Sequence, residues 1–114
     1  QRTAERTAEP EQAAEKSERL QSRADAKASR QALLAQRRPL LKEIEQLEKK
    51  LAKWHEEKAA LEAKFADPDF YVAVDRQKSE EMHIQAASLG EQIDEAEMRW
   101  LEVHEALEAL PEVD

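Results

Sequence analysis

Two long stripes of apolar residues with heptad spacing constrain this chain more than any other feature of its sequence. The first runs from Leu40 to Phe65 and the second from Met82 to Leu110, each at alternating steps of four and three residues. Only Lys58 interrupts the first stripe with a charge. This spacing aligns side chains on one helix face and is typical of a coiled coil. We therefore expect an all-α fold in which two helices pack along a common seam.

The composition favours long helices over a globular core. Charged residues make up 39% of the 114 residues, aromatic residues 4%, and Gly occurs once. Such a chain can bury a seam but not a thick core. It has no Cys and therefore no disulfide or thiolate chemistry. It also shows no signal-peptide pattern and no apolar run of the roughly 18 residues that a membrane span needs. We expect a cytoplasmic protein that makes no membrane contact.

Breaks in the heptad pattern divide the chain into two parts. Residues 1–29 contain a single large aliphatic residue, so we expect a charged, flexible linker. Residues 30–114 are expected to form a hairpin, with a first helix at about 33–65, a turn over 66–74 and a second helix at about 75–110. Two helices joined by so short a connection run antiparallel within one molecule. We expect this hairpin to be monomeric.

Particular residues indicate where the expected helices begin. Pro is tolerated in the first turn of a helix but not in its interior, so we expect the rigid part of the first helix to begin near Pro39. Asp67 and Pro68 are typical of the start of a short helical turn, and Asp75 or Ser79 would open the second helix. Because the chain begins at Gln1 rather than Met, we also expect it to be part of a longer protein.

Among the antiparallel registers, we prefer the one in which the numbers of facing residues sum to 140. Large side chains then lie opposite small ones, as even packing requires, and two ion pairs flank the seam. The facing pairs would be Trp54 with Ala86, Ile44 with Ala96, Leu40 with Trp100 and Lys58 with Met82, and the ion pairs Glu43 with Arg99 and Glu62 with Arg76. The alternative register, shifted by seven residues, would lengthen the connection and lose both ion pairs.

No arrangement of residues indicates catalysis or a metal site. The motif H-E-x-x-H is absent, and E-x-x-H occurs once, at residues 80–83, whereas a di-iron bundle needs two copies. In the preferred register His55 faces His83. This pair could bind a stray divalent metal, but a solvated surface pair is the simpler interpretation. The single Gly excludes a Gly-rich phosphate loop. We expect a protein without enzymatic activity, catalytic residues or a cofactor in this chain.

The charge pattern suggests where a partner would bind. Residues 1–32 have a net charge of +1, residues 33–66 of +2, and residues 67–114 of −11. A basic stripe on the first helix could contact a nucleic-acid backbone, and its candidate residues are Arg30, Arg37, Arg38, Lys42, Lys49, Lys50 and Lys53. The alternative is protein docking through apolar residues of the second helix that face outward, Met98 and Leu101, or through the turn residues Phe70 and Tyr71. The turn residues could instead simply fold over the end of the seam.

Three segments together resemble the C-terminal extension of ABC-F proteins, most closely of the YheS-like type, and a similar coiled-coil tail is found in Uup. The segments are R-R-P-L-L-K-E-I-E-Q-L-E-K-K-L at residues 37–51, L-E-A-K-F-A-D-P-D-F-Y at 61–71 and E-A-E-M-R-W-L-E-V-H-E-A-L-E at 95–108. The most specific pieces are the D-P-D-F-Y turn and the sequence around Trp100.

The resemblance implies a larger protein with two ATP-binding cassettes upstream, no membrane domain, and a role on the ribosome in translation. ATP and Mg would belong to those cassettes, whose motifs do not occur in these residues. Uup-type tails are associated with DNA binding. Two hypotheses remain open. In one, the chain is an arm that contacts ribosomal RNA, tRNA or DNA. In the other, it is a protein-interaction or spacer module that docks on the ATPase core or a ribosomal protein.

Overall fold

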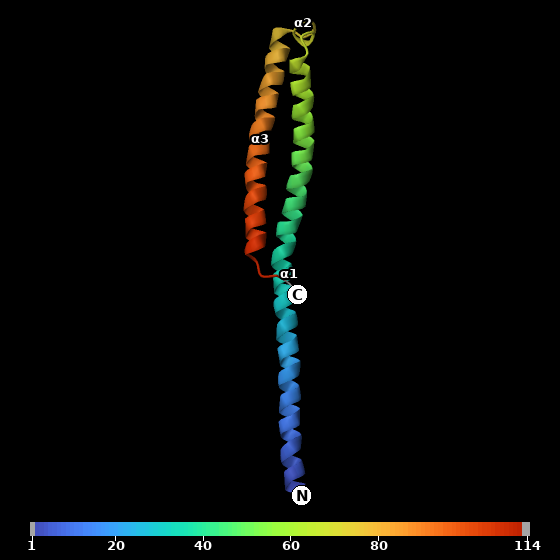
Figure 1. Cartoon of the computed structure of the whole chain (residues 1–114), viewed down its shortest axis with the longest axis vertical. Coiled ribbons are helices and arrows are strands. Elements are labelled where there is room, and N and C mark those ends of the chain that lie inside the picture. The colour runs from blue at the N-terminus through green and yellow to red at the C-terminus, as the bar shows by residue number, and fades with distance from the viewer. Residues whose placement is uncertain (1, 113–114) are drawn as a thin grey trace. The chain divides into compact units, whose positions relative to one another are not determined.

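The structure is a computed structural model that describes the backbone of residues 2–112 and the side chains of residues 10–112. Three helices follow one another: α1 (Arg2–Ala66), α2 (Phe70–Ala73) and α3 (Arg76–Ala109) (Figure 1). No strand occurs in this described part, and the all-α prediction is confirmed. The chain divides into two compact units, one formed by residues 39–109 and the other by residues 1–38 and 110–114.

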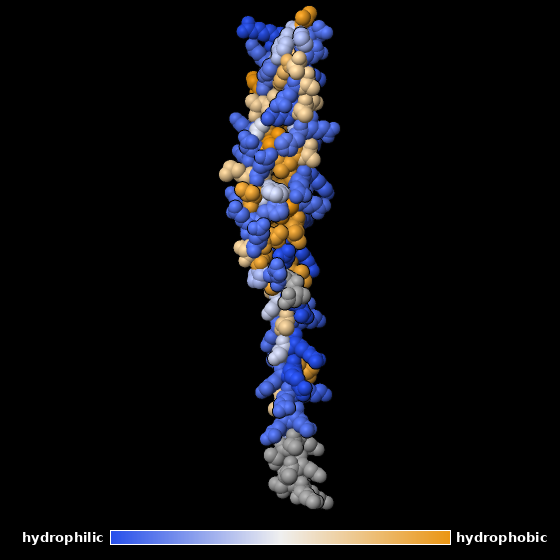
Figure 2. Space-filling view, in the orientation of Figure 1, coloured by the Kyte–Doolittle hydropathy of each residue, from blue (hydrophilic) through white to orange (hydrophobic). Residues whose placement is uncertain are grey.

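The unit of residues 39–109 is an antiparallel hairpin. In Figure 1 the second half of α1 lies beside α3 and runs in the opposite direction, with α2 at the connection. Apolar side chains gather along the middle of the hairpin, with hydrophilic ones on both sides (Figure 2). The core is a single seam, and its buried members are Ile44, Leu61, Phe70, Leu89, Ile93, Ala96 and Val103. All but Phe70 belong to the two heptad stripes, so the predicted intramolecular coiled coil is confirmed.

The preferred register is wrong. The indole N–H of Trp100 donates a 3.1 Å hydrogen bond to Glu48, whereas the preferred register places Trp100 opposite Leu40. The rings of Phe65 and His83 stack with centroids 3.8 Å apart. In both pairs the residue numbers sum to 148. This is close to the sum expected for the alternative register, which is shifted by seven residues from the preferred one. Lys58 likewise lies against Gly90, not Met82.

The packing of the connection explains why the helices meet in this register. Phe70, the first residue of α2, folds back and packs edge-on against Phe65, with ring centroids 5.7 Å apart. Asp75 caps α3, because its carboxylate accepts a 2.7 Å hydrogen bond from the backbone N–H of Lys78, as predicted. Asp67 accepts a 3.0 Å bond from the N–H of Asp69. Hence α2 closes the end of the seam.

Residues 2–38 form the first part of α1, which begins at Arg2 and continues through Pro39. The sequence instead predicted a flexible linker and a helix that becomes rigid near Pro39. Ala, Glu, Gln, Lys and Arg dominate the segment, and these residues have the highest helix propensities. The side chains of residues 10–32 are exposed, because no apolar stripe is available to bury them. The flexibility of residues 1–29 stays a prediction.

Gly90 leads to a first testable prediction. It lies inside α3 with an ordinary helical φ, and a Cβ added there would lie 3.6 Å from Nζ of Lys58, an ordinary contact. Gly costs a helix interior about 0.5–1 kcal/mol relative to Ala. We therefore expect Gly90→Ala to raise the free energy of unfolding by about that amount, measured by urea denaturation. A loss of stability would mean that Lys58 does not lie beside Gly90 as described.

Candidate binding surfaces

The basic residues proposed for nucleic-acid binding have accessible side chains. The four lysines of this set lie in the hairpin, and all are exposed on α1. The three arginines lie in the other unit, where Arg30 and Arg38 are exposed and Arg37 is half-buried. Two of the lysines have acidic neighbours on the same helix: Lys49 lies 3.2 Å from Glu45 and Lys53 lies 4.0 Å from Glu57. Exposed pairs of this kind are worth under about 1 kcal/mol. They leave both ammonium groups able to exchange their partner for a phosphate.

The ion pairs that connect the two helices use other residues. Arg99 forms a bidentate pair with Glu43, at 2.7 and 2.9 Å, and reaches Glu102 on its own helix at 3.3 Å. His55 lies 3.4 Å from Glu97. The predicted Glu43–Arg99 pair is therefore confirmed. The other predicted pair is absent, because Arg76 bonds to Glu80 and the carboxylate of Glu62 lies 3.7 Å from Lys58. The lysines of the basic stripe take no part in holding the helices together.

The Glu43–Arg99 pair makes the stability of the hairpin depend on pH. The hydrogen bond from Arg99, together with its positive charge, holds the pKa of Glu43 below the usual 4.5. The bond to Glu43 also raises the pKa of Arg99 above its ordinary value. A carboxyl group with a lowered pKa in the folded state contributes stability above its unfolded pKa. That contribution is lost as the pH falls through the folded pKa.

We therefore expect Glu43→Gln to lower Tm at about pH 7 and to lower it less at about pH 3, because the contribution of the ion pair fades as Glu43 becomes protonated in the parent chain. Thermal melts of both chains at the two pH values measure this difference. Glu45→Gln is the matched control, since Glu45 bonds only within its own helix and should show little effect at either pH. A Tm difference for Glu43→Gln that is the same at both pH values would contradict the assignment.

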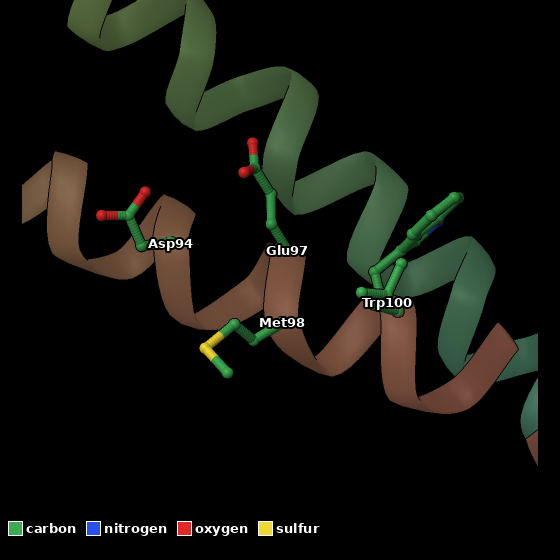
Figure 3. Close-up of a pocket in the computed structure, with 5 residues that line it drawn as sticks. Asp94, Glu97, Met98 and Trp100 are labelled. Carbon is green, nitrogen blue, oxygen red and sulfur yellow. The ribbon is translucent and has the colours of Figure 1, made fainter. Parts of the chain in front are cut away.

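The outer face of α3 is acidic and carries an apolar spot. The helix has nine Asp and Glu residues against three Lys and Arg. Met98 and Leu101 are 67% and 55% exposed, and they line a surface hollow together with Asp94, Glu97 and Trp100. Figure 3 shows Met98 pointing away from the neighbouring helix, whereas the ring of Trp100 lies beside that helix.

The two aromatic residues of the turn differ in accessibility. Phe70 is only 8% exposed and belongs to the core, which leaves it little surface for a partner, whereas Tyr71 is half-exposed. The hydroxyl of Tyr71 lies 3.3 Å from Nε2 of His83, and the ring of His83 stacks on Phe65. His83 therefore does not face His55. Sequence reasoning missed this aromatic cluster, because its members come from three helices and share no spacing.

Among the residues that the structure describes, no group of three or more His, Cys, Asp or Glu is placed to hold a metal ion. Nor does any helix in this part combine the length and the apolar character that crossing a membrane requires. The described part of the hairpin has one basic face on α1 and one acidic, partly apolar face on α3.

Comparison with known proteins gives one match. Residues 36–105 match the model of a family described as the ABC transporter C-terminal domain. The match covers more than half of the chain and includes nearly all of the hairpin. It is to a C-terminal helical domain and not to an ATPase domain, which confirms the prediction of a non-catalytic module. No curated protein and no solved structure matches the chain.

Proposed function

We propose that this chain, which belongs to the ABC transporter C-terminal domain family, is a non-catalytic arm that brings an ABC-F ATPase into contact with nucleic acid. The ligand would be ribosomal RNA, tRNA or DNA, and the arm would support a cytoplasmic role in translation. ATP and Mg would bind elsewhere in the parent protein. The resemblance of three segments to ABC-F tails supports this assignment beyond the family itself.

One observation carries the proposal: the lysines of the hairpin's basic stripe are exposed and uninvolved in its assembly. Lys42 and Lys49 are seven residues apart, and Lys53 follows four residues later. All three are exposed on α1, where a phosphate backbone could approach without disturbing the seam. The opposite helix, α3, carries an excess of carboxylates and would repel nucleic acid, so only one side of the hairpin can make this contact.

The experiment is a titration of the chain against ribosomal RNA, tRNA and branched DNA at two salt concentrations. Triple reversal of Lys42, Lys49 and Lys53 to Glu should lower the affinity at low salt by more than about tenfold. Each lost phosphate contact reduces the slope of log K against log salt by about one, so the slope should fall by about three. Unchanged binding of the triple variant at low salt would reject the proposal.

A matched control tests whether position or net charge is responsible. Lys64, Arg76 and Lys78 are also exposed and lie near the turn, outside the stripe. Reversing these three to Glu changes the net charge by the same amount. We expect this control to keep most of the parent's affinity and its salt slope, whereas an equal loss would show that only overall charge matters.

Protein docking is the second candidate, and the exposed pair Met98 and Leu101 favours it. The partner would then be the ATPase core of the same full-length protein or a ribosomal protein. This candidate uses α3 and the first uses α1, so one hairpin can serve both.

A further inference from the structure

The hollow on α3 combines apolar side chains with carboxylates. Met98 and Leu101 are three residues apart, so they are neighbours on the helix surface. Both remain more than half exposed. Trp100, which lines the same hollow, turns its indole N–H toward Glu48 on α1. Met98 and Leu101 are therefore not among the buried residues of the seam, and most of their apolar surface faces outward.

The charges around this apolar pair are negative. Asp94 and Glu97 line the hollow, and Glu102 and Glu105 follow on the next turn of α3. Of the basic groups nearby, His55 lies 3.4 Å from Glu97, and Arg99 bonds to Glu43 in bidentate fashion and to Glu102. The charge of Arg99 is thus already matched. A partner that covers Met98 and Leu101 meets carboxylates on both sides.

We propose that this face binds a basic amphipathic helix of a protein partner. Apolar residues of that helix, spaced three or four apart, would pack against Met98 and Leu101, while its Lys and Arg side chains pair with the surrounding carboxylates. Charge complementarity favours a basic helix over the other possible partners of this face. Nucleic acid would be repelled by the carboxylates, and a second copy presenting the same face would bring like charges together.

This docking face stands independently of the nucleic-acid proposal, because it lies on the other helix and uses none of the lysines of α1. The probe is a fluorescently labelled peptide of about 18 residues with Leu at helical i, i+3, i+4 and i+7 spacing and Lys at most other positions. A scrambled peptide of the same composition provides the reference. We expect the chain to bind the amphipathic peptide at least about tenfold more tightly than the scrambled one in an anisotropy titration.

The variant Met98→Asp plus Leu101→Asp should remove this preference. Its matched control is Ile84→Asp plus Ala87→Asp, which adds the same charge at exposed positions of the same spacing two heptads earlier on α3. The control should bind like the parent chain. Equal binding of both peptides by the parent, or equal loss in both variants, would overturn the proposal. Sedimentation showing that the parent dimerises through Met98 and Leu101 would also overturn it, because a second copy would then be the occupant.

Two further results separate this docking face from the nucleic-acid contact. The Met98 and Leu101 variant should bind nucleic acid like the parent, and the triple Lys variant of α1 should keep the tighter binding of the amphipathic peptide. Failure of either proposal would leave the other one standing.

Discussion

Val103→Asp is expected to abolish the hairpin. Val103 is 1% exposed, the most buried side chain in the described part of the chain. A carboxylate there would lose its water inside the apolar seam, which costs at least about 4 kcal/mol. A small domain has a total stability of only about 5–15 kcal/mol, and a two-helix unit with seven buried residues lies at the low end of that range. Circular dichroism melts and Trp fluorescence should show an unfolded or barely folded hairpin at room temperature.

Met98→Asp is the control for this result. It introduces the same charge five residues earlier on α3, at a position that is 67% exposed, where substitutions usually change stability by less than about 0.5 kcal/mol. A Val103→Asp chain that melts like the Met98→Asp chain would show that Val103 is not in a packed seam.

The second large effect is expected at the turn. Phe70→Ala should lower the free energy of unfolding by about 3 kcal/mol, because a buried Phe loses its transfer free energy and leaves a cavity. It also loses the edge-on contacts with Phe65 and Tyr71. Amide hydrogen exchange should accelerate first in α2 and at the start of α3, since these segments rest on Phe70.

Val72 supplies the matched control for Phe70. It lies in the same short helix but is 88% exposed, so Val72→Ala should leave both the unfolding free energy and the exchange pattern nearly unchanged. Similar losses in both variants would mean that α2 is held by its backbone and not by the packing of Phe70.

The architecture was predictable because the heptad stripes report directly on which side chains can be buried together. Ile44, Ile93 and Val103 were assigned to the seam by spacing alone, and all three are buried. The register between the two helices was harder to predict, because a shift by one heptad again places apolar positions opposite apolar positions. The Glu43–Arg99 pair, which we had used to choose between registers, forms in the observed one too. The Glu43–Arg99 pair therefore could not distinguish between the two registers.

The turn shows what a periodic pattern leaves out. The sequence predicted a break at residues 66–74 and a cap at Asp75, and both are present. It left open whether Phe70 folds over the end of the seam or contacts a partner, because no spacing rule connects a residue in a turn to a seam. The packing of Phe70 joins the connection to the last turn of α1 through Phe65. For the candidate binding residues, the sequence indicated exposure well on regular helices, where Met98 and Leu101 face outward, but not at Phe70.

Cross-linking tests the central claim, that α1 and α3 pair antiparallel within one molecule in the register described. The chain has no Cys, so a pair can be introduced with Lys58→Cys plus Gly90→Cys and treated with a short bismaleimide. The comparison pair is Lys58→Cys plus Met82→Cys, which the rejected register would bring together. The two partner positions lie eight residues apart on α3, about 12 Å along its axis. We predict rapid cross-linking within the monomer for positions 58 and 90 and little for positions 58 and 82. The reverse order, or products of doubled mass, would contradict the account.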